Sequence, residues 1–493
     1  MREFWSGRIA ACGLAVLYAG MPMAPVMAAE ISVGTAKVDI TPTVPIVRAG
    51  RMSTVVSKTV LSPLTATALA LEGSNGEQAI FISCDLAALR PTIPERLREL
   101  IAARLPDFDA GKLVVNTTHT HNAPALAVGR YIIPDGVVTP AEYIDFLLDK
   151  MAGAAVQAWK GRRPAGVSWG VGHAVVGHSR LAVYEDGSAQ MYGKTDRADF
   201  SHFQGFEDHT VNVLFFWDRD KKLRAMAVDV GCPAQTLERQ SEISADYWHD
   251  VRLLLRKEHS ADLAVVGWCS AAGEISPHLL YDQRAETRMY RRRGLTETQE
   301  IARRIARAVA DAFEVAKDDI HFDVPFVHRV AQLALPMREI TDQQAAASRD
   351  TIEKLSKRFD ALPRFSHEAG YLHRRIGREK TVVERYEQQK INPNLDLAIH
   401  VLRLGDVAIA TNSFELFVDY GMRIKARSKA LQTFLIQLTS ASTIYLPPKR
   451  ALQGGGYGAI ITVSIVGPEG GQKLVDRSVE LIHSLWADEK KKE

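Results

Sequence analysis

Residues 112–125 read KLVVNTTHTHNAPA, and this stretch is the starting point for predicting the fold. Its apolar run, Leu113 to Val115, is typical of a buried strand and gives way at once to polar residues. A second buried strand is predicted at 78–87, QAIFISCDLA, with an amphipathic helix between the two at 93–105. Two strands joined by a helix pair in parallel, so this unit predicts an α/β layer architecture.

Further helices and hairpins follow this unit along the chain. We predict helices at 140–159, 245–259, 297–316, 342–361 and 473–486, strands within 166–176 and 262–278, and hairpins at 209–231 and 397–417. Thr296 with Gln299, and Thr341 with Gln344, have the spacing of capping boxes at two of the helix starts. Because hairpins are antiparallel and the first unit is parallel, we expect a layered mixed sheet flanked by helices.

The segment 342–390 differs from its surroundings because it is highly charged. It is predicted to form two helices joined near Pro363. Two interpretations stay open: an insertion or lid over the sheet, and a plain structural hairpin. The sequence has no internal repeat and no low-complexity linker, so residues 30–493 are expected to form one domain that contains this insertion.

The first 29 residues have the pattern of a secretory signal peptide. Arg2 and Arg8 flank a short n-region, an apolar stretch covers 9–17, and small residues ending in PVMAA precede Glu30. The alternative is an uncleaved anchor, but the apolar run is shorter than the roughly 20 residues that span a bilayer. We therefore expect a periplasmic or secreted protein with at most peripheral membrane contact.

The charge and the cysteine count limit the class of partner. The net charge is +3 for 493 residues, and it becomes +2 without the two arginines and one glutamate of the predicted signal. This near-neutral balance argues against nucleic acid as the main partner. The small-molecule or lipid substrate that we expect comes from the resemblance described below. Cys84, Cys232 and Cys269 remain after cleavage, and an odd number leaves at least one thiol unpaired within the chain. The sequence does not determine the oligomeric state.

His119 and His121 are the first candidates for chemistry. In an extended segment alternate side chains share a face, so the two imidazoles lie close enough to serve one metal site. They follow a buried strand, where α/β sheets place their ligand sites, and imidazole is a good ligand for zinc. The alternative is a pair of ordinary polar residues at a strand end, and the pattern alone does not decide between the two.

Other candidates each have a structural alternative. Cys232, before a proline, either presents its sulfur to a cleft or is a small buried residue. Glu274 and Ser276 share a face within GEISPH, and Ser276 is either a nucleophile or a structural serine, since no G-x-S-x-G surrounds it. Glu415, in NSFELF, is either functional or a capping residue.

A glycine-rich turn near the end of the chain carries the last candidates. Tyr445 and Tyr457 stand on either side of it, in YLPPKRALQGGGY. No Lys-Ser/Thr pair follows the glycines, which excludes a phosphate-binding P-loop. The tyrosines are therefore of interest for their hydroxyls.

Taken in order, these segments resemble the neutral (non-lysosomal) ceramidase family. The segments that carry the resemblance are VGTAKVDITP (33–42), THTHNAP (118–124), GEISPH (273–278), NSFELF (412–417) and the two tyrosines twelve residues apart. The match covers most of residues 30–493 and implies a ceramidase-like catalytic domain. The short remainder after Tyr457 leads us to expect that the family's C-terminal immunoglobulin-like domain is absent.

The resemblance implies a zinc ion held by two histidines, a glutamate and a tyrosine. By position, His119 matches the first histidine, Glu415 the glutamate and Tyr445 the tyrosine. Cys232 stands in VGCPAQ where the family has its second histidine ligand. A thiolate is a competent zinc ligand, so three alternatives stay open: Cys232 binds zinc, His121 replaces it, or the site takes another metal.

The resemblance also implies roles in catalysis. His121 matches a histidine that moves protons, Tyr457 a tyrosine that faces the reacting carbonyl, and Arg180 an arginine of the substrate site. Glu274 stands for the family's aspartate, next to Ser276. The implied function is zinc-dependent hydrolysis of an amide bond in an N-acyl sphingosine-like substrate. The alternatives are a hydrolase of the same fold acting on an ester, another amide or a glycoside, and an inactive binding protein.

Overall fold

The computed structural model describes residues 28–441 and 443–486. Most of the predicted signal peptide, 1–27, lies outside the described residues. Among the described residues, no helix combines the length and the apolar composition needed to cross a bilayer.

The strand–helix–strand unit predicted from 78–121 is confirmed. Strand β5 (Gln78–Cys84) is followed by helix α1 (Thr92–Arg104) and strand β6 (Leu113–Thr117). The two strands pair in parallel, from Ile80 opposite Leu113 to Cys84 opposite Thr117. Helix α2 (Pro140–Lys160) follows, and it begins with a Thr139–Glu142 capping box that the sequence analysis did not identify.

Strand β1 (Ala28–Asp39) joins the parts of the sheet because its partners change along its length. Residues 28–30 pair with β16, 31–39 with β4, and 31–33 with β7 on the other edge. In the described part of the chain, twelve strands are connected in this way. The remaining members are β4 (Thr65–Gly73), β7 (Arg163–His173), β12 (Thr210–Trp217), β13 (Leu223–Val230), β14 (Ala264–Cys269), β16 (Asp323–Pro336), β17 (Asn394–Leu404), β18 (Val407–Thr411) and β20 (Gln432–Ile436).

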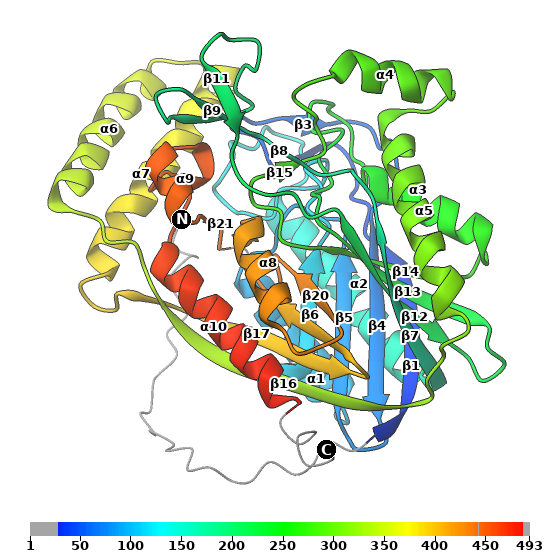
Figure 1. The fold of residues 1–493 in the computed structure, drawn as a ribbon. Helices are drawn as coiled ribbons and strands as arrows, with labels where there is room; N and C mark the ends of the chain where they lie inside the picture. Colours follow the sequence, from blue (N-terminus) through cyan, green and yellow to red (C-terminus); the bar gives the residue numbers. More distant parts are fainter. Residues whose placement is uncertain (1–27, 442, 487–493) are drawn as a thin grey trace.

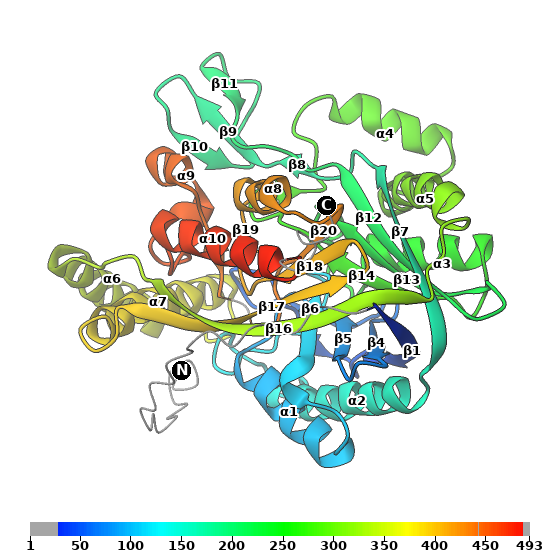
Figure 2. The ribbon, with the colours of Figure 1, turned by 60° about the horizontal axis from the view of Figure 1, so that its bottom comes forward.

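The sheet doubles over a central apolar core, and helices cover its outer faces (Figures 1 and 2). The central core contains Phe81, Phe216, Trp268, Phe326 and Phe434, which come from both halves of the sheet. Helices α1 and α2 cover β4 and β5, while α3 (Tyr247–Glu258) and α5 (Glu297–Ala316) cover β7, β12 and β13. Helices α8 (Val418–Arg427) and α10 (Pro468–Ser484) cover β16 and β17. The predicted mixed sheet flanked by helices is therefore confirmed.

Residue size explains how closely α2 packs on the sheet. Ala66, Ala68 and Ala70 of β4 point toward α2, whereas Leu69 and Leu71 point to the central core. At Gly34 of β1, an added Cβ would overlap the carbonyl oxygen of Ala158 in α2. This close approach requires glycine there.

The charged segment 342–390 forms two antiparallel helices at one side of the molecule, α6 (Asp342–Asp360) and α7 (His367–Gln388) (Figure 1). Leu355, Leu372 and Ile376 form the small core between them. The capping boxes predicted at Thr296 and Thr341 are both present. The pair is inserted between β16 and β17, and α7 reaches the candidate site described below.

Candidate functional site

The candidate site lies where β6 ends, beside two very short strands. Strands β19 (Glu415–Leu416) and β21 (Tyr445–Leu446) pair in parallel, and Glu415 is directly opposite Tyr445. His119 follows β6 by two residues and has a φ of 61°, in the left-handed region that non-glycine residues rarely adopt. Such a strained backbone persists only where the surroundings hold it, and it is common at functional sites.

His119 is fixed by one ring nitrogen and presents the other to Glu415. Its Nδ1 donates to the carbonyl oxygen of Ala87 at 2.5 Å, which leaves Nε2 as the nitrogen that faces Glu415. That Nε2 lies 3.5 Å from Oε2 of Glu415, and both side chains are almost fully buried. Burial alone would raise the pKa of Glu415, but His119, Tyr445 and Arg180 outweigh it and lower the pKa to about 2. Glu415 is therefore a buried carboxylate.

Arg180 is the buried cation of this group. It lies between β8 (His178–Ser179) and β9 (Leu181–Tyr184). Its guanidinium donates to the Gly273 carbonyl at 2.8 Å, to the Tyr445 hydroxyl at 3.1 Å and to Oε1 of Gln235 at 3.4 Å. Burial and the neighbouring Glu415 raise the pKa of Tyr445 well above its ordinary value. Arg180 thus faces one carboxylate and one neutral phenol.

His121 forms a second group with Glu238 and Gln235. Its Nδ1 lies 3.3 Å from Oε2 of Glu238, and its Nε2 lies 2.9 Å from Nε2 of Gln235. Because Oε1 of Gln235 accepts from Arg180, its amide nitrogen faces His121 and donates to it. Burial lowers the pKa of His121, which favours the neutral ring. Burial would raise the pKa of Glu238, but His121 and His278 hold it well below its ordinary value.

Tyr457 connects the site to the inserted helices. Its ring packs edge-on against Tyr445, with centroids 5.8 Å apart. Its hydroxyl accepts a hydrogen bond from Arg378 of α7, whose guanidinium lies 5.3 Å from the ring centroid. The segment 342–390 therefore contributes a side chain to the site. No local sequence pattern marks Arg378, because only tertiary packing brings α7 to Tyr457.

The position of Cys232 does not agree with its predicted role as a metal ligand. Its Sγ donates to the Val176 carbonyl at 3.3 Å, and the side chain is buried in an apolar cluster with Tyr247 and Trp248. Burial raises the pKa of this thiol well above its ordinary value, which keeps it protonated. Among the described residues, no three His, Cys, Asp or Glu side chains lie close enough to hold one metal ion. Gln235, three residues later, occupies the site instead.

Cys232 therefore corresponds to the other interpretation, a small buried residue. All three cysteines in the described part of the chain are free and buried. This agrees with the expectation that an odd number of cysteines leaves a thiol unpaired.

Glu274 and Ser276 make hydrogen bonds to segments that surround the site. The Glu274 carboxyl accepts from the backbone N–H of Val418, at the start of α8, at 3.0 and 3.2 Å, and burial raises its pKa to about 8. Ser276 Oγ accepts from Tyr192 at 3.2 Å and from the backbone of His278 at 3.0 Å. Within the described chain no base contacts Ser276 Oγ, so the geometry does not favour Ser276 as a nucleophile.

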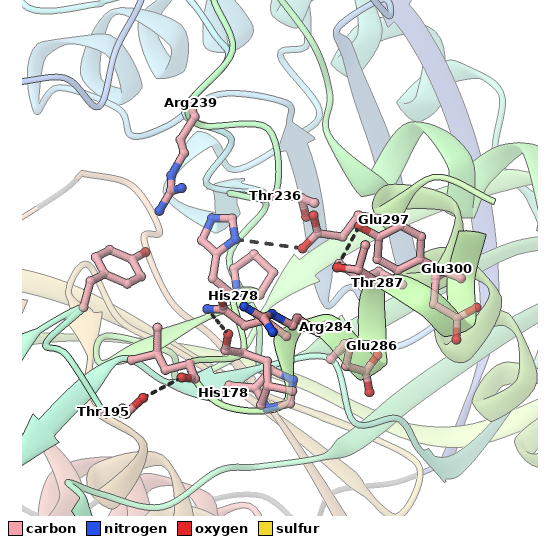
Figure 3. Close-up of a pocket in the computed structure, with 18 of the residues that line it drawn as sticks. His178, Thr195, Thr236, Arg239, His278, Arg284, Glu286, Thr287, Glu297 and Glu300 are labelled. Carbon is pink, nitrogen blue, oxygen red and sulfur yellow. Dashed lines mark hydrogen bonds and ion pairs between the residues drawn. The ribbon is translucent and has the colours of Figure 1, made fainter. Parts of the chain in front are cut away.

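A polar cavity of about 770 Å³ adjoins the Glu238 side of the site (Figure 3). His278 lines it and lies 3.6 Å from Glu238 and 3.9 Å from Glu297, the second contact being drawn in Figure 3. His119, Glu415 and Tyr445 do not line this cavity. Tyr192 and His278, which line it, both contact Glu238, so the cavity lies beside the pair of His121 and Glu238.

Two solved structures are similar to this chain. Neutral ceramidase from Pseudomonas aeruginosa aligns with a TM-score of 0.65 and 15% identity, over 92% of this chain and 75% of that one. A ceramidase complexed with C2 aligns with a TM-score of 0.64 and 15% identity, over 93% of this chain and 76% of that one. No family model matches the sequence, and no curated protein matches it. The chain therefore has the fold of a neutral ceramidase catalytic domain.

Proposed function

We propose that this chain is a hydrolase that cleaves an amide bond in an N-acyl substrate. One observation carries the proposal: His119, Glu415, Tyr445 and Arg180 meet in a buried group at the end of β6, in a ceramidase-like fold. The pair of His121 and Glu238 next to this group supplies a base. The signal-like segment 1–29 supports a periplasmic or secreted location.

We also propose that His119, Glu415 and Tyr445 would hold a zinc ion. The donor set fits, because Ala87 fixes Nδ1 of His119 and leaves Nε2 facing a carboxylate oxygen at 3.5 Å. Three protein donors with a fourth position open are the usual pattern of a catalytic zinc site. When bound there, zinc lowers the pKa of water and polarises a carbonyl group.

His121 is the proposed general base. Its neutral ring has its lone pair on Nε2, which accepts a hydrogen bond from the Gln235 amide N–H. A proton to be abstracted would approach Nε2 at the position that this N–H now holds. Glu238, at 3.3 Å from Nδ1, stabilises the imidazolium that forms when Nε2 takes up the proton. The same proton is then available to the leaving amine.

Two side chains are proposed to act on the carbonyl side. Tyr457 donates its hydroxyl proton toward the developing oxyanion, and Arg378 orients that hydroxyl. Arg180 balances the negative charge of Glu415 and holds Tyr445 in place. These groups are fixed before substrate arrives, which is what electrostatic catalysis requires.

The test is an assay of the purified protein on short- and long-chain N-acyl sphingosines, simpler N-acyl amines, esters and glycosides. We expect free amine from N-acyl compounds, and a fall in kcat of about 100-fold or more in His121→Asn. The exposed His202, on another part of the surface, gives the matched control His202→Asn. Turnover of esters or glycosides without any amide would replace the proposed linkage, and turnover of nothing would favour a binding protein.

A further inference from the structure

Four arginines lie together beside Tyr457, and none of them belongs to the group around His119. Arg374 and Arg378 are one turn apart on α7, Arg90 lies just before α1, and Arg130 is in the loop between β6 and α2. The helix is held against that loop by His373, whose Nε2 lies 2.9 Å from the carbonyl oxygen of Gly129, next to Arg130.

The four positive charges act on one another. Burial first, and then Arg130 and Arg378, lower the pKa of Arg374 to about 9. Burial, Arg130 and Arg374 likewise lower the pKa of Arg90 to about 9. A lowered arginine pKa means that the surroundings disfavour the charged form.

Arg374 is the buried centre of the cluster. Its side chain is 6% exposed, and its guanidinium carbon lies 5.2 Å from the ring centroid of Tyr131. The Nε atoms of Arg374 and Arg130 are both buried without a hydrogen-bond partner. On the other side of the cluster, Arg378 contacts Tyr457, so the arginines adjoin the proposed reaction centre.

Three members of the cluster, Arg130, Arg374 and Arg378, differ in their ion pairs from the buried Arg252 and Arg180. Arg252 forms two contacts with the Asp85 carboxylate, and Arg180 faces Glu415. Within residues 28–441 and 443–486, no carboxylate forms an ion pair with Arg130, Arg374 or Arg378. Buried like charges without a counter-charge are costly, so this arrangement is suited to an anion that arrives from outside.

We propose that Arg130, Arg374 and Arg378, with Arg90 beside them, form an oxyanion subsite for the substrate, which holds a sulfonate, sulfate, phosphate or carboxylate group while the scissile carbonyl faces Tyr457. Guanidinium groups match the geometry of such oxyanions through paired N–H donors. The inference rests on the proposed function and narrows it: the substrate class is N-acyl compounds with an acidic headgroup, rather than neutral ceramides.

The first experiment measures anion binding without catalysis. Sodium sulfate is titrated into wild type, Arg374→Gln, Arg130→Gln and the control Arg375→Gln, with Tm and calorimetric binding as readouts. Arg375 is on the same helix but packs on Tyr371, outside the cluster. We expect sulfate to raise the Tm of wild type and the control clearly more than that of Arg374→Gln or Arg130→Gln, which keep only the general stabilisation that sulfate gives by exclusion from protein surfaces. Without sulfate, Arg374→Gln should be at least as stable as wild type, because like-charge repulsion is relieved.

The second experiment compares two substrates that differ only in charge. They are an N-acyl-2-aminoethanesulfonate and the N-acyl-2-aminoethanol with the same acyl chain. We expect kcat/KM to favour the sulfonate by about tenfold or more, and the ratio to approach one in Arg374→Gln. Inorganic sulfate should compete with the sulfonate, which separates recognition of a headgroup from binding of a free anion elsewhere.

Three results decide the inference. Equal kcat/KM for the two compounds would overturn it, even if sulfate binds. A large loss of stability in Arg374→Gln together with an unchanged response to sulfate would show that the arginines are structural. Hydrolysis of neither compound would count against the proposed function alone. In that case, sulfate binding that is lost in Arg374→Gln would still support the oxyanion subsite. Sulfate binding that is retained in Arg374→Gln would overturn the subsite.

Discussion

Replacing Arg252 with methionine should lower the free energy of unfolding by about 3–5 kcal/mol, the usual cost of leaving a buried charge without its partner. Asp85 is fully buried, and Arg252 of α3 approaches it in bidentate fashion at 2.7 and 2.9 Å. The carboxylate also accepts from the Thr65 backbone N–H and hydroxyl, both at 2.9 Å, and from the Thr118 hydroxyl at 3.2 Å. Those neutral donors do not replace the lost cation.

The matched variant is Asp85→Asn combined with Arg252→Met. It removes both charges, so most of the lost stability should return, because a neutral amide costs far less to bury than a carboxylate. Urea denaturation followed by tryptophan fluorescence measures both variants, and an unchanged m-value shows that the comparison is valid. A loss below about 1 kcal/mol in Arg252→Met, or no recovery in the double variant, would refute the reasoning.

Three further outcomes follow from the site. Zinc measured by mass spectrometry should be lost in His119→Ala and retained in Cys232→Ser; the opposite result would restore the thiol as a ligand. Burial raises the pKa of Glu274 from its ordinary value of about 4.5 to about 8 in the folded protein. The protonated carboxyl therefore stabilises the fold fully below about pH 4.5, and this stabilisation is lost as pH rises through about 8. The Tm of wild type should therefore fall relative to Glu274→Gln between about pH 5 and pH 8, and parallel profiles would contradict the assignment. Tyr457→Phe should lower kcat about 100-fold with little change in Tm, whereas an equal effect in the surface variant Tyr371→Phe would show that the loss is not specific.

Local patterns were sufficient to predict most of the framework. The apolar run before His119 identified β6, and the helix before it required β5 and β6 to be parallel, as observed. Thr296 and Thr341 marked helix starts because capping boxes depend on residues only three apart. These features are determined by near neighbours, so the sequence contains the information needed to find them.

The candidate site was harder to predict because it depends on side-chain direction and on distant packing. Motif order identified His119, Glu415 and Tyr445, which the structure brings together. Sequence position could not show that the backbone after Gly231 turns the Cys232 thiol toward Val176 and leaves Gln235 at the site. The arginines of α7 were missed for a similar reason, since they meet Tyr457 only through tertiary packing.

The inserted helices leave and rejoin the sheet at neighbouring points. Strand β17 pairs with β16 along its whole length, up to Asn394 opposite Pro336, and the Met337 N–H donates to the Pro393 carbonyl. Residues 337–393 therefore form a closed excursion at the tip of a long hairpin, while His119 and Glu415 stand on separate parts of the framework. An exchange of this excursion between proteins of the same fold would replace Arg374 and Arg378 without altering the register of the strands. Such an exchange would move part of the headgroup subsite together with Arg378, which orients Tyr457, and would leave Arg130 and the group around His119 in place.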